Sequence, residues 1–538
     1  MCFLFAKFKS TAYSRVCEKI QGAENILCTK CFNCAYPVKV DSQPAPSERI
    51  KYIPLNRDQL LWQPLDVEQL IGEDHPARII WEVSGRMDLS RFEAEVKTQE
   101  GKAGRPRWSA RVLVSVWVYS YTIEIASARA IERMMSHEPG LRWVTACEVI
   151  NYHTLSDFRV EHQGALEDLF AQFLALLDEA GVVDLRTLLQ DGTKVRAVAG
   201  SRSLHRRKTL EKQVRTARKV IQKLDQEAVE EGEGMDARQR AAQARAAREA
   251  LKRAEGALKK LQALEAVTPK KERGDLRVSD SEAEARRMKH ADGSWAPSYN
   301  VQITTEVQSG MVVGVTMSSA ANDTQELMPA LEQVEKNCGE LPVVVIADNG
   351  YATRQNVEQT SAQEIELIAP WKADSSREAG ACARNGIDAE FVPSKFAVQR
   401  GGKKLLCPAG KMLVVIGQKT HHGVRKSVFE AEERECRACP WVKKCCGRKG
   451  GPRRIERVVE SPAMKKYLAR MKRPEVKQLY RQRSRIAEFP HLWAKAAKKW
   501  RRFSVRGMAK AGMEALWVML AYNVTQWIRL GRPEPAIQ

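Results

Sequence analysis

The hydrophobic repeat of this chain changes from a helical period to a strand period near residue 185. From Leu55 to about Ala180, apolar residues recur at helical spacing, and Ser109 is a suitable N-cap for the segment "ARVLVSVWVYSY". Beyond that point "RTLLQDGTKVRAVA" is typical of a strand, and "SYNVQITTEVQSGMVVGVTMSS" is typical of a hairpin that turns at Ser309-Gly310. A helix in "DTQELMPALEQVEKN" and a short buried strand in "PVVVIADNGY" follow. This order predicts a mixed α/β sheet behind an all-α domain.

The predicted sheet is interrupted twice, which sets the expected domain boundaries. We expect a helical N-terminal domain at 49–180, which fits a helix-turn-helix DNA reader and a small helical bundle equally well. An α/β domain follows at 181–535. Residues 201–266 are rich in Ala, Glu, Lys, Arg and Leu and predict an inserted antiparallel helical hairpin, whose alternating charges favour solvated faces over a dimer contact or DNA arm. A second insertion, Cys-rich and basic, is expected at 352–479.

Residues 1–48 form a Cys-rich, weakly periodic segment that ends in the linker-like "DSQPAPSER". Its "CTKCFNC" offers three thiolates to a metal, with Cys17 as the nearest fourth ligand. We interpret the segment as a poorly structured extension, dispensable or mis-started, in preference to a metal site. The 13 cysteines of the chain are unevenly placed, and a disulfide framework is not expected.

The net charge of +22 is concentrated near the C-terminus. Between Trp441 and Lys510 there are 23 basic residues and four acidic ones. Cationic tracts of this kind bind nucleic-acid phosphates in a salt-dependent way. The tract lacks the sustained apolar face of a membrane-surface helix, and the apolar runs of the chain are too short to span a bilayer. No secretory signal is expected at the N-terminus. These features predict a cytoplasmic nucleic-acid-binding protein that does not bind a membrane.

Three acidic residues stand where an α/β sheet and a basic helix would expose them. Asp191 is expected to end the strand "TLLQ", Asp348 ends "VVVIA", and Glu488 lies in the basic tract. Alone, an Asp at a strand end is usually a turn residue. Three converging carboxylates, however, are hard oxygen ligands for Mg²⁺ or Mn²⁺, and two such ions can activate an attacking oxygen and stabilise a leaving oxygen.

The same residues carry a family resemblance. "LLQDGTKVRA", "SYNVQITTE", "VVIADNGYAT" and "YRQRSRIAEFPHLWAK" resemble bacterial insertion-sequence transposases of the DDE type, which have a ribonuclease H-like core. "INYHTLSDFRVEH" is similar to the helical N-terminal domain of that family. The resemblance spans about Leu55 to Leu530. It implies that Asp191, Asp348 and Glu488 are catalytic acids that bind two Mg²⁺ or Mn²⁺ ions.

The family's Tyr-Arg-Glu-Lys signature falls on Tyr480, Arg483, Glu488 and Lys495. Four residues separate Arg483 from Glu488, one more than in the best-described relatives, which turns Arg483 by about 100° on a helix relative to Glu488. Arg481 and Arg485 are therefore alternatives as the phosphate clamp. The full set of expected DNA contacts is Tyr480, Arg481, Arg483, Arg485, Lys495, Lys498, Arg501 and Arg502.

Five cysteines of the second insertion form a local cluster. Cys407, Cys436 and Cys439, with Cys445 or Cys446, supply four thiolates for a structural zinc ion, and His421 or His422 could substitute. The alternative is a set of reduced, partly buried cysteines. A zinc ion would help to fold an insertion that has few apolar residues.

Together these features predict a DNA transposase. It would bind the terminal inverted repeats of its insertion sequence in double-stranded DNA, cleave strands there and transfer them to target DNA. Pairing of two ends favours a homodimer or higher oligomer on DNA. Two alternatives are a non-catalytic, DNA-binding repressor derived from a transposase and a nuclease without strand transfer.

Overall fold

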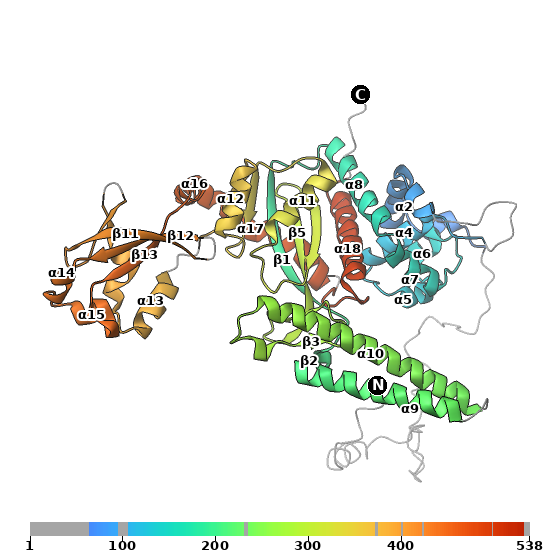
Figure 1. Cartoon of the computed structure of the whole chain (residues 1–538). Helices are drawn as coiled ribbons and strands as arrows, with labels where there is room; N and C mark the ends of the chain where they lie inside the picture. The colour runs from blue at the N-terminus through green and yellow to red at the C-terminus, as the bar shows by residue number, and fades with distance from the viewer. Residues whose placement is uncertain are drawn as a thin grey trace, which may run out of the picture. The chain divides into compact units, whose positions relative to one another are not determined.

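The computed structural model describes residues 64–94, 106–230, 235–371, 375–399, 402–421, 424–497 and 499–531 (Figure 1). The predicted extension at 1–48, including Cys17 and the "CTKCFNC" segment, lies outside the described residues.

Short helices precede the first sheet, as the sequence predicts. Helix α4 (Ala110–Thr122) is buried on almost every side, and its Trp117 donates a hydrogen bond from Nε1 to the Leu155 carbonyl oxygen at 3.0 Å. Ser109 caps this helix by accepting a hydrogen bond from the Val112 amide. The other helices of this region are η1 (Val67–Leu70), α2 (Pro76–Arg86), α3 (Ser90–Glu93), α5 (Ala128–Met134), α6 (Pro139–Val144), α7 (Tyr152–Glu161) and α8 (Gln163–Glu179).

A mixed sheet of eight described strands follows. Its strands are β1 (Thr187–Arg196), β2 (Leu204–His205), β3 (Val278–Ser279), β4 (Arg286–Lys289), β5 (Trp295–Glu306), β6 (Val312–Ser318), β7 (Val344–Ala347) and β8 (Glu366–Ile368). One edge of β1 pairs antiparallel with β5, and the other edge pairs in parallel with β7, which pairs in parallel with β8. The opposite edge of β5 pairs with β4 near its start and with β6 along the rest of its length. The pairing of β5 with β6 is the predicted hairpin. This mixed sheet is compatible with a ribonuclease H-like core.

Helices pack on this sheet and join it to the N-terminal region. The helices are α11 (Leu327–Cys338), α12 (Arg354–Ala362), α16 (Pro462–Arg470), α17 (Pro474–Leu492) and α18 (Met508–Arg529). Helix α17 contacts β1 and β7, whereas α18 contacts β6 on one side and α4 and α8 on another. The Asn523 amide bonds both backbone groups of Val312, accepting from its nitrogen at 2.8 Å and donating to its oxygen at 2.7 Å. This contact fixes α18 along the β6 edge.

Two long helices, α9 (Arg207–Glu230) and α10 (Met235–Val267), lie between β2 and β3 in the chain. They pair along their length (Figure 1). Salt bridges connect them, for example Arg218 to Glu255 at 2.7 Å. Their base buries Leu210, Ala257 and Leu261 against β3. Most other side chains of the pair are exposed, so its outer part is held chiefly by charge pairs and contacts between the two helices.

The predicted basic insertion contains a second sheet that the sequence analysis missed. It is antiparallel and orders its described strands β13 (Arg454–Val458), β12 (Val424–Ala431), β11 (Met412–His421), β10 (Lys404–Leu406) and β9 (Ala397–Val398). Short helices α13 (Ser375–Arg384), α14 (Glu433–Arg437) and α15 (Val442–Cys446) accompany it. The sheet has a small apolar core of its own around Leu413 and Phe429. Strand β8 and helix α12, which fall inside the predicted range 352–479, belong to the first sheet instead.

Candidate active site

Asp191 and Asp348 follow paired positions on neighbouring parallel strands. Gln190 of β1 is the partner of Ala347 of β7, so Asp191 and Asp348 each come directly after one of these paired residues. Strand β7 ends at Ala347, but β1 continues to Arg196 because its other edge pairs with β5 throughout. The prediction that a strand ends at Asp191 is therefore wrong. At Asp191 only the parallel pairing of β1 with β7 ends. Ligands commonly bind outside the carboxyl ends of parallel strands.

Two side chains of α17 hold the carboxylate of Asp191. Arg483 Nη2 lies 3.0 Å from Asp191 Oδ1, and His491 Nε2 lies 3.5 Å from Oδ2. The Gly192 amide also donates to Oδ1 at 3.0 Å. Burial alone would raise the pKa of Asp191, but the hydrogen bond and charge of His491 and the charge of Arg483 outweigh it and lower the pKa. Asp191 is therefore an ionised carboxylate, with Arg483 at one oxygen and His491 at the other.

The Asp348 carboxylate contributes to a region of negative charge. It accepts a hydrogen bond from the Gly350 amide at 2.6 Å, and no described cation forms an ion pair with it. Burial raises the pKa of the Tyr351 hydroxyl well above its usual value, and the charges of Asp323, Asp191 and Asp348 raise it further. The negative charges of three carboxylates thus disfavour ionisation of one buried phenol. As hard oxygen donors beside each other, Asp191 and Asp348 fit a divalent cation.

Glu488 is not brought to these two residues. It lies on α17, as predicted, but its side chain is exposed. On an ideal helix it points about 100° away from the middle of the face that carries Arg483 and His491. Among the described residues, no group of three or more His, Cys, Asp or Glu side chains is arranged to hold a metal ion. Helix α17 contains Pro490 and passes into a π-helical turn at Trp493–Ala497, so its backbone is irregular next to Glu488.

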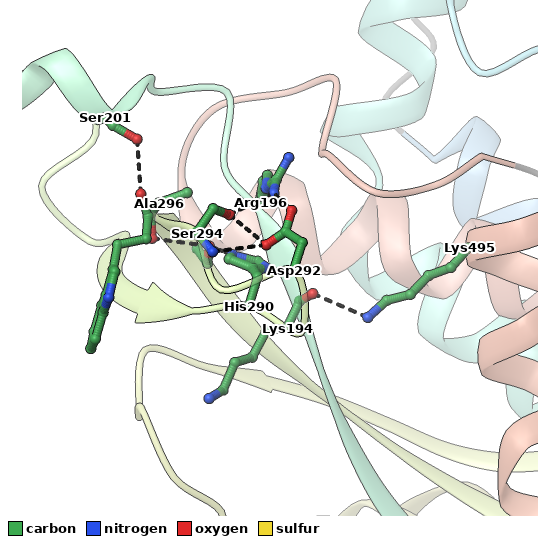
Figure 2. A network of polar contacts seen from close by, with 10 residues as sticks. Lys194, Arg196, Ser201, His290, Asp292, Ser294, Ala296 and Lys495 are labelled. Carbon is green, nitrogen blue, oxygen red and sulfur yellow. Dashed lines mark hydrogen bonds and ion pairs between the residues drawn. The ribbon is translucent and has the colours of Figure 1, made fainter.

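Lys495 lies in this π-helical turn and contacts β1. Its ammonium group donates to Thr193 Oγ1. It also donates to the Lys194 carbonyl oxygen at 3.2 Å (Figure 2). Burial lowers the pKa of Lys495. Beyond Lys194 on the same strand, Arg196 pairs with Asp292 at 2.5 Å. Lys495 therefore braces the end of α17 against the strand that carries Asp191.

The other predicted DNA contacts differ in exposure. Arg481, Arg501 and Arg502 are exposed, and Tyr480 is half-buried. The side chain of Arg485 and the whole of Lys498 lie outside the described residues. Of the three alternatives for a phosphate clamp, Arg483 is bound to Asp191, and Arg481 is the exposed one whose side chain the structure describes.

Comparison with protein families matches two parts of the chain. Residues 65–161 match the family described as Transposase domain (DUF772), and residues 406–528 match the family described as Transposase DDE domain. No curated protein matches the chain. The two matches support an insertion-sequence transposase of the DDE type. The DDE match covers Glu488 and helices α17 and α18, whereas Asp191 and Asp348 lie before it.

Members of this family generally use divalent metals. No described helix of the chain is both long and apolar enough to cross a membrane.

The sequence analysis missed Asp323 and a group of buried polar residues beside it. Asp323 lies in the loop between β6 and α11. Its Oδ1 accepts hydrogen bonds from Asn300 at 2.7 Å and Gln302 at 2.8 Å, both on β5. A signal was present in "YNVQITTE", where Asn300, Gln302 and Thr304 alternate with the apolar residues Val301 and Ile303. Buried polar side chains at such spacing need partners, and these partners lie at the candidate site.

The five clustered cysteines of the chain line one small cavity in the second sheet. All are free thiols, and the Lys411 amide donates to Cys407 Sγ at 3.1 Å. Burial raises the pKa of the Cys445 thiol to about 12. Cys436, Cys439 and Cys446 are near, but the described cysteines do not form a metal-binding arrangement. The predicted zinc ion is thus not supported, and the side chains of His421 and His422 lie outside the described residues.

Proposed function

We propose that this transposase binds the terminal inverted repeats of its element, cleaves a DNA strand there and transfers the freed end to target DNA. The observation that carries the proposal is the placement of Asp191 and Asp348 at equivalent points of two parallel strands, beneath the basic helix α17. A bound Mg²⁺ or Mn²⁺ pair would supply activation of the attacking oxygen and stabilisation of the leaving oxygen.

Different residues of the chain have different roles in the proposed reaction. Asp191 and Asp348 supply carboxylate oxygens to the cations, and the buried strands keep the two side chains in place. Exposed cations such as Arg481 and Arg501 bind the DNA backbone. In the arrangement seen here Arg483 and His491 contact the carboxylate of Asp191, so α17 has to turn before Glu488 can face the two aspartates. Binding two element ends together requires at least two copies of the chain.

A cleavage and joining assay tests this function. The purified chain is incubated with duplex DNA that carries the sequences flanking its gene, with Mg²⁺ or with EDTA. Metal-dependent nicks at the repeat ends, followed by joined products, are expected for a transposase. Nicks without joined products would indicate a nuclease that lacks strand transfer. Specific binding without nicks would indicate a repressor, and neither binding nor cleavage would contradict all three functions.

The exposure of Arg481 and the bound state of Lys495 predict different effects on DNA binding. Replacing Arg481 by Ala is expected to reduce the slope of log affinity against log salt concentration by about 0.9, because one phosphate contact is lost. Lys495→Gln is expected to leave that slope nearly unchanged, since its ammonium group is bound to Thr193 and Lys194. Fluorescence anisotropy with labelled duplex DNA at several salt concentrations measures both slopes. Equal reductions in the two variants would contradict this distinction.

A further inference from the structure

A chain of buried hydrogen bonds runs from β1 across β5. Thr304 Oγ1 donates to Gln190 Oε1 at 2.6 Å, and Gln190 Nε2 donates to Gln302 Oε1 at 2.7 Å. The three side chains are almost completely buried. Gln190 immediately precedes Asp191 on β1, so the backbone that carries the first acid is fixed by this side chain. In a low dielectric such connected bonds reinforce one another.

Tyr351, which lies in the loop after β7, belongs to the same chain of hydrogen bonds. Its hydroxyl donates to Gln302 Oε1, which therefore accepts two hydrogen bonds. Tyr351 is three residues beyond Asp348 and fully buried. Gln302 thus connects the strand of Asp191 to the loop of Asp348. Because its oxygen is occupied by two donors, its remaining group, the Nε2 amide, has to find an acceptor.

Asp323 is that acceptor. Its Oδ1 receives hydrogen bonds from Gln302 Nε2 at 2.8 Å and from Asn300 Nδ2 at 2.7 Å. A carboxylate oxygen suits this position because it has lone pairs for two donors and carries no proton of its own. Among the residues that the structure describes, none donates a hydrogen bond to the other oxygen, Oδ2. The hydrogen-bond chain therefore ends at Asp323.

Two glycines leave room for this carboxylate beside the two acids. Gly192 pairs with Gln302 across the strands, and a Cβ placed on it would lie 2.6 Å from Asp323 Oδ1. A Cβ on Gly350 would lie 2.9 Å from Asp348 Oδ1 and 3.8 Å from the Asp323 Cβ. Asp323 is thus adjacent to the residue after Asp191 and to the loop that follows Asp348.

The geometry points to Asp323 as a positioning residue for the two metal-binding acids. By accepting from Gln302 and Asn300 it terminates the buried chain that joins Gln190 to Tyr351, and it thereby sets the spacing of Asp191 and Asp348. This inference rests on the proposed function, which assigns metal binding to those two acids. Asp323 acts through the amides, so the ability to accept hydrogen bonds matters and the negative charge does not.

Direct Mn²⁺ titration of the full chain, followed by electron paramagnetic resonance, tests this role without reference to activity. Asp323→Ala removes the acceptor and is expected to weaken Mn²⁺ binding about 10-fold, the scale found for residues that orient metal ligands. Asp323→Asn keeps a carbonyl oxygen for both amides and is expected to stay within about 2-fold of the unaltered chain, well short of that loss. Gln325→Ala, in the same loop but exposed, is the matched control and should bind Mn²⁺ as the unaltered chain does.

Three results would overturn the inference. They are unchanged Mn²⁺ binding in Asp323→Ala, an equal loss in Asp323→Asn, and no Mn²⁺ binding by the unaltered chain. If Asp323→Ala does not fold, Asn300→Ala removes one of the two donors, and unchanged Mn²⁺ binding there would also count against the role. The proposed function is tested by a different result. If the chain and its variants bind Mn²⁺ as expected but the chain does not cleave element ends, the proposed function is wrong and the positioning role of Asp323 still holds.

Discussion

Asp191→Asn and Asp348→Asn are each expected to lower metal-dependent strand cleavage by about 1,000-fold or more, the order found when one member of a catalytic unit is lost. Asparagine matches the shape of aspartate and keeps one acceptor oxygen, so the Gly192 and Gly350 amides retain a partner. The substitution removes the charge that a divalent cation requires. Single-turnover cleavage of end-containing duplex DNA measures the effect, with circular dichroism to show that each variant is folded.

Asp184→Asn is the matched control, because Asp184 lies just before β1, pairs with Arg186 at the surface and is remote from both acids in the pairing register. It should cleave at the rate of the unaltered chain. Glu488→Gln is expected to abolish cleavage while leaving Mn²⁺ binding by the DNA-free chain nearly unchanged, since Glu488 faces away from Asp191. If Asp191→Asn, Asp348→Asn and Glu488→Gln all retained cleavage, the assignment of these acids would be wrong.

Gly192→Ala is expected to destabilise the protein by about 1–3 kcal/mol, as overpacked interiors do, and to reduce cleavage strongly. The new Cβ would lie 2.6 Å from both Asp323 Oδ1 and Gln302 Nε2, and 3.1 Å from Tyr351 Oη. These atoms are the ends of side chains, but they are hydrogen-bonded to one another in a buried network. They cannot withdraw without breaking the bonds that connect β1 to the Asp348 loop.

Urea unfolding and the cleavage assay measure both effects. Gly200→Ala is the control, because no atom lies within 4 Å of the position of its Cβ and its backbone has φ of −85°. That variant should remain within about 0.5 kcal/mol of the unaltered chain. A Gly192→Ala protein as stable and active as Gly200→Ala would show that the buried network tolerates expansion and does not fix the site.

The arrangement around Asp191 also gives a structural meaning to the residues between Arg483 and Glu488. With four intervening residues, the two side chains cannot share one face of α17, and the face toward β1 is taken by Arg483 and His491. The charge of Asp191 is thereby balanced by the Arg483 guanidinium. Pro490 and the π-helical turn beyond it interrupt regular hydrogen bonding in the segment that has to turn. Metal binding and a change in α17 are therefore coupled in the proposed mechanism.

Local patterns in the sequence were enough to place several elements. The change of hydrophobic period predicted the helical region, the hairpin of β5 and β6, and the short strand before Asp348, because each of these depends on which face of a segment is buried. The Ser109 cap depends on one side chain and its own helix. By contrast, the second sheet was missed, since its strands bury few apolar side chains and their many charged residues obscure the alternating pattern.

Residue types and their order along the sequence determined which acids could bind metal, which tract could bind DNA and which family the chain resembles. Only the tertiary structure decided how far β1 continues past Asp191, because that depends on its pairing with β5. The same holds for the bonds of Arg483, His491 and Lys495 to β1 and for the place of Asp323 beside Gly192. Such contacts join residues up to about 300 positions apart in the sequence. A local sequence pattern carries no information about which of these residues lie close together in space.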